Sequence, residues 1–153
     1  MPTAFTLNGR AVTSAAAPTR LLLDVLRNEY GLTGARYGCG EEQCGTCAVL
    51  VDGAAVLACG REIGSLAGRS VTTAEGLGTP EAPSALQRAF LDEQAGQCGY
   101  CLAGILIAAT ALLAHTPRPT RAEIVTALDP HLCRCGAHPR IVRAVERVAG
   151  VGA

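Results

Sequence analysis

The chain has 153 residues, and its 13 basic side chains balance 13 acidic ones. This length suits one ordinary domain or two small ones, and two small cores would each be marginal without a metal or disulfide to support them. The balanced charge argues against nucleic acid or an anionic membrane as the main partner, and the scarcity of aromatic side chains argues against stacking platforms for bases or sugars.

The N-terminus lacks the continuous apolar stretch of a secretory signal, because Asn8, Gly9 and Arg10 interrupt it. We therefore expect no export signal in this chain and a cytoplasmic location, or a periplasmic one if a partner chain carries the signal. The longest nearly uncharged stretch, residues 98–114, is shorter than the roughly twenty residues that span a bilayer. It predicts a buried helix and no membrane span.

A β-hairpin is predicted first. Residues 4–7 and 10–14 flank Asn8-Gly9, a dipeptide that supplies the positive φ angles of a tight turn. A helix is predicted next, introduced by Pro18 and Thr19 and ended by Gly31. Its apolar face is expected to comprise Leu22, Val25, Leu26 and Tyr30, widened by Leu21 and Leu23.

A glycine-rich loop at 34–47 precedes a second predicted hairpin, in which residues 48–51 and 54–58 flank Asp52-Gly53. The first half is therefore expected to follow a ββαββ order. Glycines and prolines then interrupt the chain over residues 74–83. We place a domain boundary there, which divides the chain into residues 1–76, a linker at 77–83, and residues 84–153.

The second half has a helical period, and helices are predicted at 84–94, 99–115, 120–128 and 139–149. Thr120 and Glu123 have the spacing of a capping box. Asp129-Pro130 should end the third of these helices, because the residue before proline disfavours helical angles. Pro139 suits the first turn of the last helix.

The first cysteine group has the spacing C-x4-C-x2-C, with a fourth cysteine further along, and comprises Cys39, Cys44, Cys47 and Cys59. This is the spacing of a plant-type [2Fe-2S] loop. A two-residue turn in the second hairpin places Cys47 opposite Ala58, so that Cys59 returns beside the loop. A zinc site or disulfides remain alternatives, although zinc ligands usually come as paired short knuckles.

Glycines surround these cysteines at positions 38, 40 and 45. They permit backbone angles closed to bulkier residues, so that N–H groups can turn toward anionic sulfur.

The second cysteine group comprises Cys98, Cys101, Cys133 and Cys135. The first two are expected at a helix start, on one face and near the positive end of the helix dipole. The last two alternate in an extended loop and can complete a four-thiolate site. Zinc remains an alternative, and so does a redox C-x-x-C, which leaves Cys133 and Cys135 unexplained.

Taken in order, GCGEEQCGTCAVLVDG, QCGYCLAG and CRCGAHPRI resemble the iron–sulfur subunit of the xanthine oxidase family of molybdenum hydroxylases, over essentially residues 3–149. The subset with isoquinoline oxidoreductase or aldehyde dehydrogenase small subunits is the most similar. The resemblance implies an α+β fold, with an N-terminal β-grasp plant-type ferredoxin-like domain and a C-terminal four-helix [2Fe-2S]-binding domain.

The resemblance also implies a role for each group. It implies one [2Fe-2S] cluster on Cys39, Cys44, Cys47 and Cys59, and a second on Cys98, Cys101, Cys133 and Cys135. The second cluster would lie beside a molybdopterin cofactor held by a separate large chain, with Cys135 nearest the pterin and electrons leaving through the first cluster. Gln97 would contact the pterin through its amide, or else is an ordinary polar residue that caps the helix.

No catalytic acid, base or nucleophile is predicted, and the histidines need no role. Substrate chemistry, on an aldehyde or an N-heterocycle, is therefore expected on the partner chain. Relatives that feed a flavin often continue Cys-Arg-Cys with Thr-Gly-Tyr, whereas Cys135 is followed here by Gly136-Ala137-His138. We therefore expect a cytochrome c or another acceptor, and a flavin subunit stays as the less favoured alternative.

The positive mean hydropathy favours a stable heteromer. Two alternatives stay open. One is a freestanding two-cluster ferredoxin, which should have a markedly acidic surface for docking. The other is a zinc-stabilised interaction module without redox activity.

Overall fold

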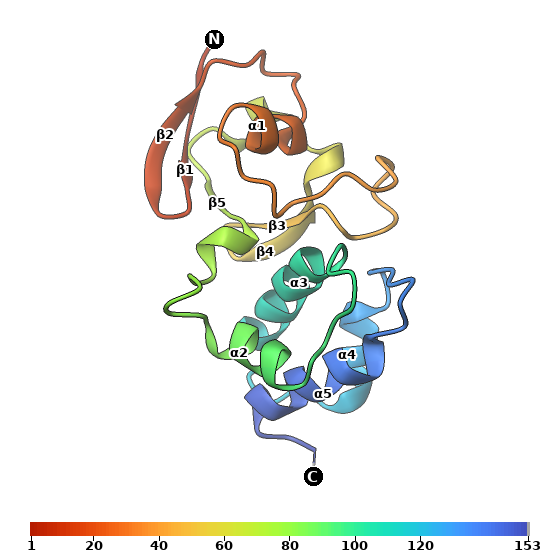
Figure 1. Cartoon of the computed structure of the whole chain (residues 1–153). Coiled ribbons are helices and arrows are strands. Elements are labelled where there is room, and N and C mark those ends of the chain that lie inside the picture. The colour runs from red at the N-terminus through yellow and green to blue at the C-terminus, as the bar shows by residue number, and fades with distance from the viewer. Residues whose placement is uncertain (153) are drawn as a thin grey trace.

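The computed structural model describes residues 1–152, which form a sheet-containing half and a helical half stacked along one axis (Figure 1). The N-terminus lies at the end of the sheet half and the C-terminal end of the chain at the far end of the helical half. The predicted α+β fold is confirmed. The sheet half contains β1 (Thr3–Leu7), β2 (Arg10–Ser14), α1 (Leu22–Asn28), β3 (Ala48–Val51), β4 (Ala54–Leu57) and β5 (Ser70–Thr72). The helical half contains α2 (Ala85–Asp92), α3 (Leu102–His115), α4 (Arg121–Leu128) and α5 (His138–Ala149).

The strands form one mixed sheet in the order β2-β1-β5-β3-β4. β5 lies in its middle, parallel to β1 and antiparallel to β3. The ββαββ order missed this strand, because three residues are too few to show an alternating pattern. Its conformation comes from pairing with a neighbour on each side, which a local sequence pattern does not contain.

Both predicted hairpins are present. Asn8 and Gly9 have φ of 48° and 81°, and Asp52 and Gly53 have φ of 50° and 85°, as tight hairpin turns require. In the second hairpin Val51 pairs with Ala54.

The predicted α1 is correct in its core and wrong at its ends. It begins at Leu22, because the preceding residues form a turn in which Arg20 N–H donates to the Ala17 carbonyl, and Leu21 is extended. Leu21 is 42% exposed, so it does not widen the apolar face. The helix ends at Asn28, so Tyr30 lies beyond it and not on its apolar face as predicted. Tyr30 packs edge-on against Phe5 with ring centroids 6.0 Å apart.

The predicted helices of the second half all form. Capping boxes begin α2 at Ser84 and α4 at Thr120, the latter as predicted. The start of α3 was predicted three residues too early: Gly99 has φ +77°, a left-handed conformation that a right-handed helix does not accept. Cys98 therefore lies in a loop, and Cys101 is only the residue that precedes the helix.

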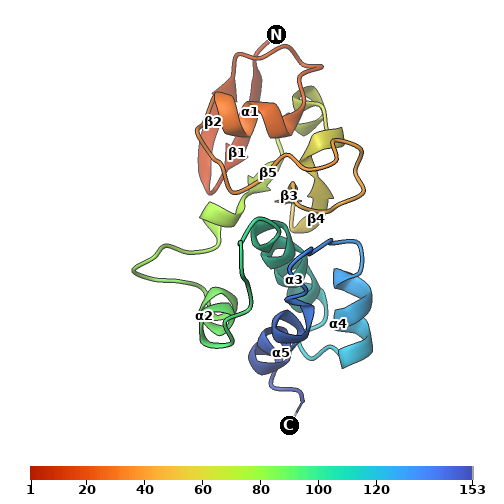
Figure 2. The ribbon, with the colours of Figure 1, turned by 45° about the vertical axis from the view of Figure 1, so that its right-hand side comes forward.

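The two halves meet where α3 packs against β3, in a hydrophobic cluster of Ala48, Leu50, Ile107 and Ala111. Figure 2 shows α3 beneath β3 and β4, with the connecting segment around residue 80 looping outward. The domain limits at 76 and 84 stay a prediction. Among residues 1–152, no helix has both the length and the apolar character needed to cross a membrane.

Candidate metal centres

The first cysteine loop is shaped so that backbone N–H groups point at sulfur. Cys39 Sγ accepts from the N–H groups of Glu41 and Gln43, each at 3.3 Å, and Cys44 Sγ accepts from the N–H of Cys39 at 3.4 Å. The loop needs its glycines: Gly40 has φ +70°, and a Cβ on Gly38 would lie 2.6 Å from Cys44 Sγ. This is the inward N–H arrangement that the glycines predicted.

The exposed and the buried thiols of this loop differ in pKa, because hydrogen bonds act on the first and burial on the second. Hydrogen bonds from Glu41 N–H, then from Gln43 and Cys44, lower the pKa of the Cys39 thiol to about 7. Cys47 and Cys59 are buried at the base of the loop, and burial raises the pKa of Cys47 to about 12. The hairpin register explains why they meet, because Ala58 N–H donates to the Cys47 carbonyl at 3.2 Å.

The second cysteine group forms where the segment before α3 meets the loop between α4 and α5. Cys98 Sγ and Cys135 Sγ lie 3.6 Å apart, and the Cys101 thiol interacts with that of Cys133. The backbone N–H of Tyr100 and the Cys135 thiol lower the pKa of Cys98. Burial, reinforced by the Cys133 thiol, raises the pKa of Cys101 to about 12.

In each group the sulfur atoms come in close pairs, with Cys39 beside Cys44 and Cys47 beside Cys59 in the first. Within residues 1–152, no three histidine, cysteine, aspartate or glutamate side chains converge on a place for a single metal ion. Two pairs of thiols fit a [2Fe-2S] cluster, in which each of two irons takes two protein thiolates. The buried thiols also fit, because a buried thiolate needs a nearby cation to compensate its charge.

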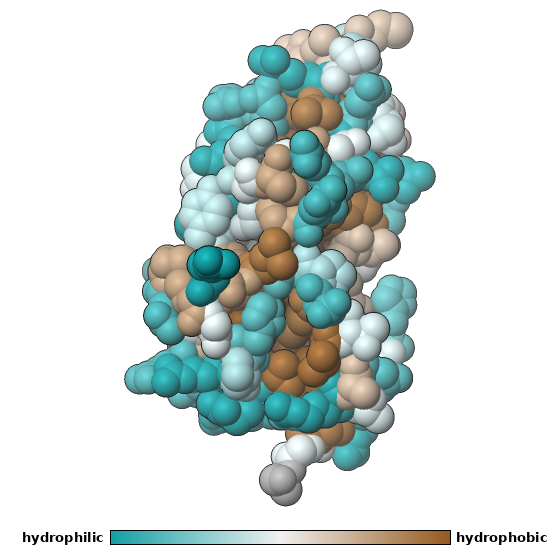
Figure 3. All heavy atoms as spheres, turned by 90° about the vertical axis from the view of Figure 1, so that its right-hand side faces the viewer, coloured by the Kyte–Doolittle hydropathy of each residue, from teal (hydrophilic) through white to brown (hydrophobic). Residues whose placement is uncertain are grey.

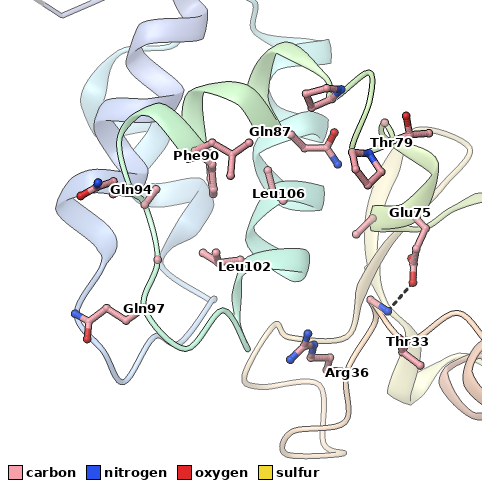
Figure 4. Close-up of a pocket in the computed structure, with 18 residues that line it drawn as sticks. Thr33, Arg36, Glu75, Thr79, Gln87, Phe90, Gln94, Gln97, Leu102 and Leu106 are labelled. Carbon is pink, nitrogen blue, oxygen red and sulfur yellow. Dashed lines mark hydrogen bonds between the residues drawn. The ribbon is translucent and has the colours of Figure 1, made fainter.

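Gln97 lies beside the second group. Its Nε2 donates to the Cys135 carbonyl at 3.1 Å, so it ties the two segments together rather than capping a helix, and its side chain is exposed. It stands at one end of a groove of about 640 Å³ that is lined from both halves of the chain (Figure 4). Arg36 lines the groove from the sheet half, and Leu102 and Phe90 line it from the helical half.

Sequence reasoning missed the residues that connect the two groups. Leu132 N–H donates to the Cys44 carbonyl at 3.0 Å, and the Thr46 hydroxyl donates to the Tyr100 carbonyl at 3.0 Å. His131 is buried against Gly45, and burial lowers its pKa. In the sequence, only a position within two residues of a cysteine marked these residues, because the contacts join residues far apart along the chain.

Two family models together match most of the chain. The 2Fe-2S iron-sulfur cluster binding domain matches residues 5–72, and the [2Fe-2S] binding domain matches residues 73–146. The chain thus carries two iron–sulfur domains, each of which contains one of the cysteine groups.

Whole-chain relatives agree. The chain is 48% identical to one of the subunits of nicotinate dehydrogenase from Pseudomonas putida, over 94% of this chain and 91% of that protein. It is 44% identical to the alpha chain of isoquinoline 1-oxidoreductase from Brevundimonas diminuta, over 95% of each. The crystal structure of quinoline 2-oxidoreductase from Pseudomonas putida 86 matches with a TM-score of 0.93 and 38% identity, over 97% of this chain and 92% of that one. The chain therefore belongs to the [2Fe-2S] iron–sulfur subunits of the xanthine oxidase family of molybdenum hydroxylases, the electron-transfer subunits of these enzymes.

Proposed function

We propose that this chain holds one [2Fe-2S] cluster on each cysteine group and relays electrons from a molybdopterin centre in a large partner chain to an external acceptor. The observation that carries the proposal is the arrangement of the thiols: close pairs on loops that are hydrogen-bonded to each other. The ligands are Cys39, Cys44, Cys47 and Cys59 for the first cluster and Cys98, Cys101, Cys133 and Cys135 for the second.

The chain's own residues hold the clusters and adjust their redox properties, and they take no part in the bond-making chemistry on the substrate. When bound, the clusters supply one-electron oxidation and reduction. N–H groups aimed at Cys39 and Cys98 stabilise negative charge on sulfur, and burial of Cys47 keeps water from that side of the first site. Carboxylates and histidines take no part, since substrate chemistry belongs to the partner.

The second site faces the partner in this proposal. Leu132, next to Cys133, is 65% exposed, and Val125, which lines the same hollow, is 48% exposed. Figure 3 shows the side of the molecule that carries the ends of both cysteine loops, with hydrophobic side chains gathered on its helical half. Exposed hydrophobic side chains of this kind favour a protein interface.

Gln97 is proposed to contact the pterin. Its Nε2 is held by the Cys135 carbonyl, which leaves Oε1 to accept a hydrogen bond from a neighbouring cofactor. Gln97→Ala should slow reduction of the second cluster by substrate in the assembled enzyme. Gln94→Ala, an exposed glutamine of the same loop, should leave that rate unchanged. Equal rates in both variants would exclude the contact.

The proposed substrate class is inferred from the names of the relatives. Those named for nicotinate, isoquinoline and quinoline act on N-heteroaromatic rings, so we propose hydroxylation of such a ring by the partner chain. An aldehyde is the second candidate, because the chain is also 38% identical to part of the aldehyde oxidoreductase of Megalodesulfovibrio gigas. A cytochrome c is proposed as acceptor, since the loop after Cys135 lacks the Thr-Gly-Tyr continuation.

The test is anaerobic purification of the tagged chain from its native host with whatever copurifies. We expect a large molybdenum-containing chain, and bleaching of the visible cluster absorption when nicotinate or quinoline is added. Bleaching by aldehydes alone would select the second candidate. An iron-containing monomer without a partner would make the chain a freestanding ferredoxin and overturn the proposal.

A further inference from the structure

Hydrogen bonds join the two cysteine loops directly beside the proposed ligands. Leu132 N–H donates to the Cys44 carbonyl, and Leu132 precedes Cys133. The Thr46 hydroxyl donates to the Tyr100 carbonyl, where Thr46 precedes Cys47 and Tyr100 precedes Cys101. The first contact is made by backbone atoms alone. The second depends on one side-chain hydroxyl.

The Thr46 contact lies in a tightly built junction. Thr46 is buried, and a Cβ on Gly104 would overlap the Gly45 carbonyl, so α3 approaches the first loop as closely as backbone allows. Tyr100 is held from the other side, because its hydroxyl donates to the Tyr37 carbonyl at 2.5 Å and Arg36 stacks 5.0 Å from its ring centroid. The hydroxyl–carbonyl contact is therefore fixed in position.

We propose that the Thr46 hydroxyl is an electron-transfer bridge between the two sites. The proposal rests on the proposed function, in which both cysteine groups hold clusters. The route runs from Cys101 through the Tyr100 carbonyl, across the hydrogen bond to Thr46 Oγ1, and along the chain to Cys47. Electronic coupling decays less steeply through covalent and hydrogen bonds than across a van der Waals gap. One electron crosses: the second cluster is oxidised as the first is reduced, and no proton moves.

Thr46 acts through two ligands, Cys47 next to it in the chain and Cys101 across the hydrogen bond to the Tyr100 carbonyl. It is therefore a positioning residue with an electronic role. It does not donate to sulfur, and its removal should leave the cluster potentials unchanged. A purely structural role would instead alter cluster content or the potentials when the hydroxyl is lost. These readouts separate the two roles.

The experiment uses the purified complex and compares Thr46→Val, which removes the hydroxyl at nearly constant volume, with Thr46→Ser, which keeps it. After rapid photoreduction, the rate of electron equilibration between the clusters is measured, together with their spin–spin splitting, iron content and midpoint potentials. We expect Thr46→Val to slow the transfer several-fold and to reduce the splitting, with iron content and potentials unchanged. Thr46→Ser should match the wild type.

Thr46→Ala, which lacks the hydroxyl and does not put a methyl group in its place, should reproduce the slow transfer and guards against local distortion by valine. Wild-type rates in the valine and alanine variants, with both clusters intact, would overturn the bridge alone. Equal slowing in Thr46→Ser would do the same. A wild-type complex without two [2Fe-2S] signals would overturn the proposed function as well.

Discussion

Single residues decide whether the first cysteine loop can adopt the conformation that brings its thiols together. Gly45 has φ +78°, and the three atoms nearest to a Cβ built on it all belong to the imidazole of His131. Its place is therefore limited twice, by its backbone angle and by a side chain from the second loop. His131, for which no role was expected from the sequence, thus packs against the first cysteine loop.

Gly45→Ala should prevent proper loading of the first site, because a left-handed alanine costs roughly 1–2 kcal/mol and the methyl group also meets His131. Gly53→Ala is the matched control: it has φ +85° with nothing within 4 Å of the added carbon, so only the backbone cost applies. Iron content and the first-site spin signal report the difference. Equal loss in both variants would exclude the His131 contact, and Gly45→Ala with His131→Ala should recover part of the iron.

The cysteine assignment makes a reciprocal prediction. Cys39→Ser should remove the first reduced [2Fe-2S] signal and leave the second, whereas Cys98→Ser should do the reverse, because each cluster needs all four thiolates. Spin resonance of each dithionite-reduced complex measures this. Loss of both signals from either single variant would mean that the sites do not load independently.

At the scale of elements, α4 positions the loop that carries Cys133 and Cys135, and its start depends on a capping box. Thr120→Ala should lower the free energy of unfolding by about 1 kcal/mol, because it removes the side-chain acceptor for Glu123 N–H. Thr126→Ala, exposed on the same helix, should have no such cost. Thermal unfolding of the loaded chain compares them, and equal midpoints would contradict the capping role.

The same cap gives a pH dependence. Hydrogen bonds from the N–H and the hydroxyl of Thr120 lower the pKa of Glu123 below its ordinary value. A carboxyl whose folded pKa is depressed stabilises the fold above its unfolded pKa, and this contribution disappears as the pH falls through the folded value. The stability difference between wild type and Glu123→Gln should therefore shrink in acid. A constant difference between neutral and acidic pH would count against it.

The elements that the sequence predicted are those with local signals. Asn8-Gly9 and Asp52-Gly53 mark their turns, Thr120 and Glu123 mark the start of α4, and the helical period marks α2 to α5. β5 escaped prediction because its pairing partners are distant in sequence. The start of α3 was misplaced because apolar periodicity does not reveal that Gly99 is left-handed.

The features of the two cysteine sites likewise divide into those that the sequence predicted from a local signal and those that it did not. Cysteine spacing indicated the two groups, and the hairpin register placed Cys59 beside the first loop. Contacts between the loops, such as Thr46 with Tyr100, depend on how α3 docks on β3 and have no local signature.

At the scale of the whole molecule, the distance between the two sites depends on the α3–β3 junction. Ile107 is fully buried there, whereas Ile105 is fully buried within the helical half. Changing either isoleucine to alanine should lower the free energy of unfolding by about 2–5 kcal/mol. Ile107→Ala should loosen the junction, separate the calorimetric transitions of the two halves and slow transfer between the clusters. Ile105→Ala should destabilise the helical half alone, and indistinguishable scans would contradict this division.

The most direct test of the central claim is the metal content and low-temperature spin resonance of the wild-type complex, purified anaerobically and reduced with dithionite. Two [2Fe-2S] clusters predict roughly four irons per chain and two distinct reduced signals, with molybdenum in the partner. A colourless chain that contains zinc and no iron would contradict the account and make these cysteine groups structural zinc sites.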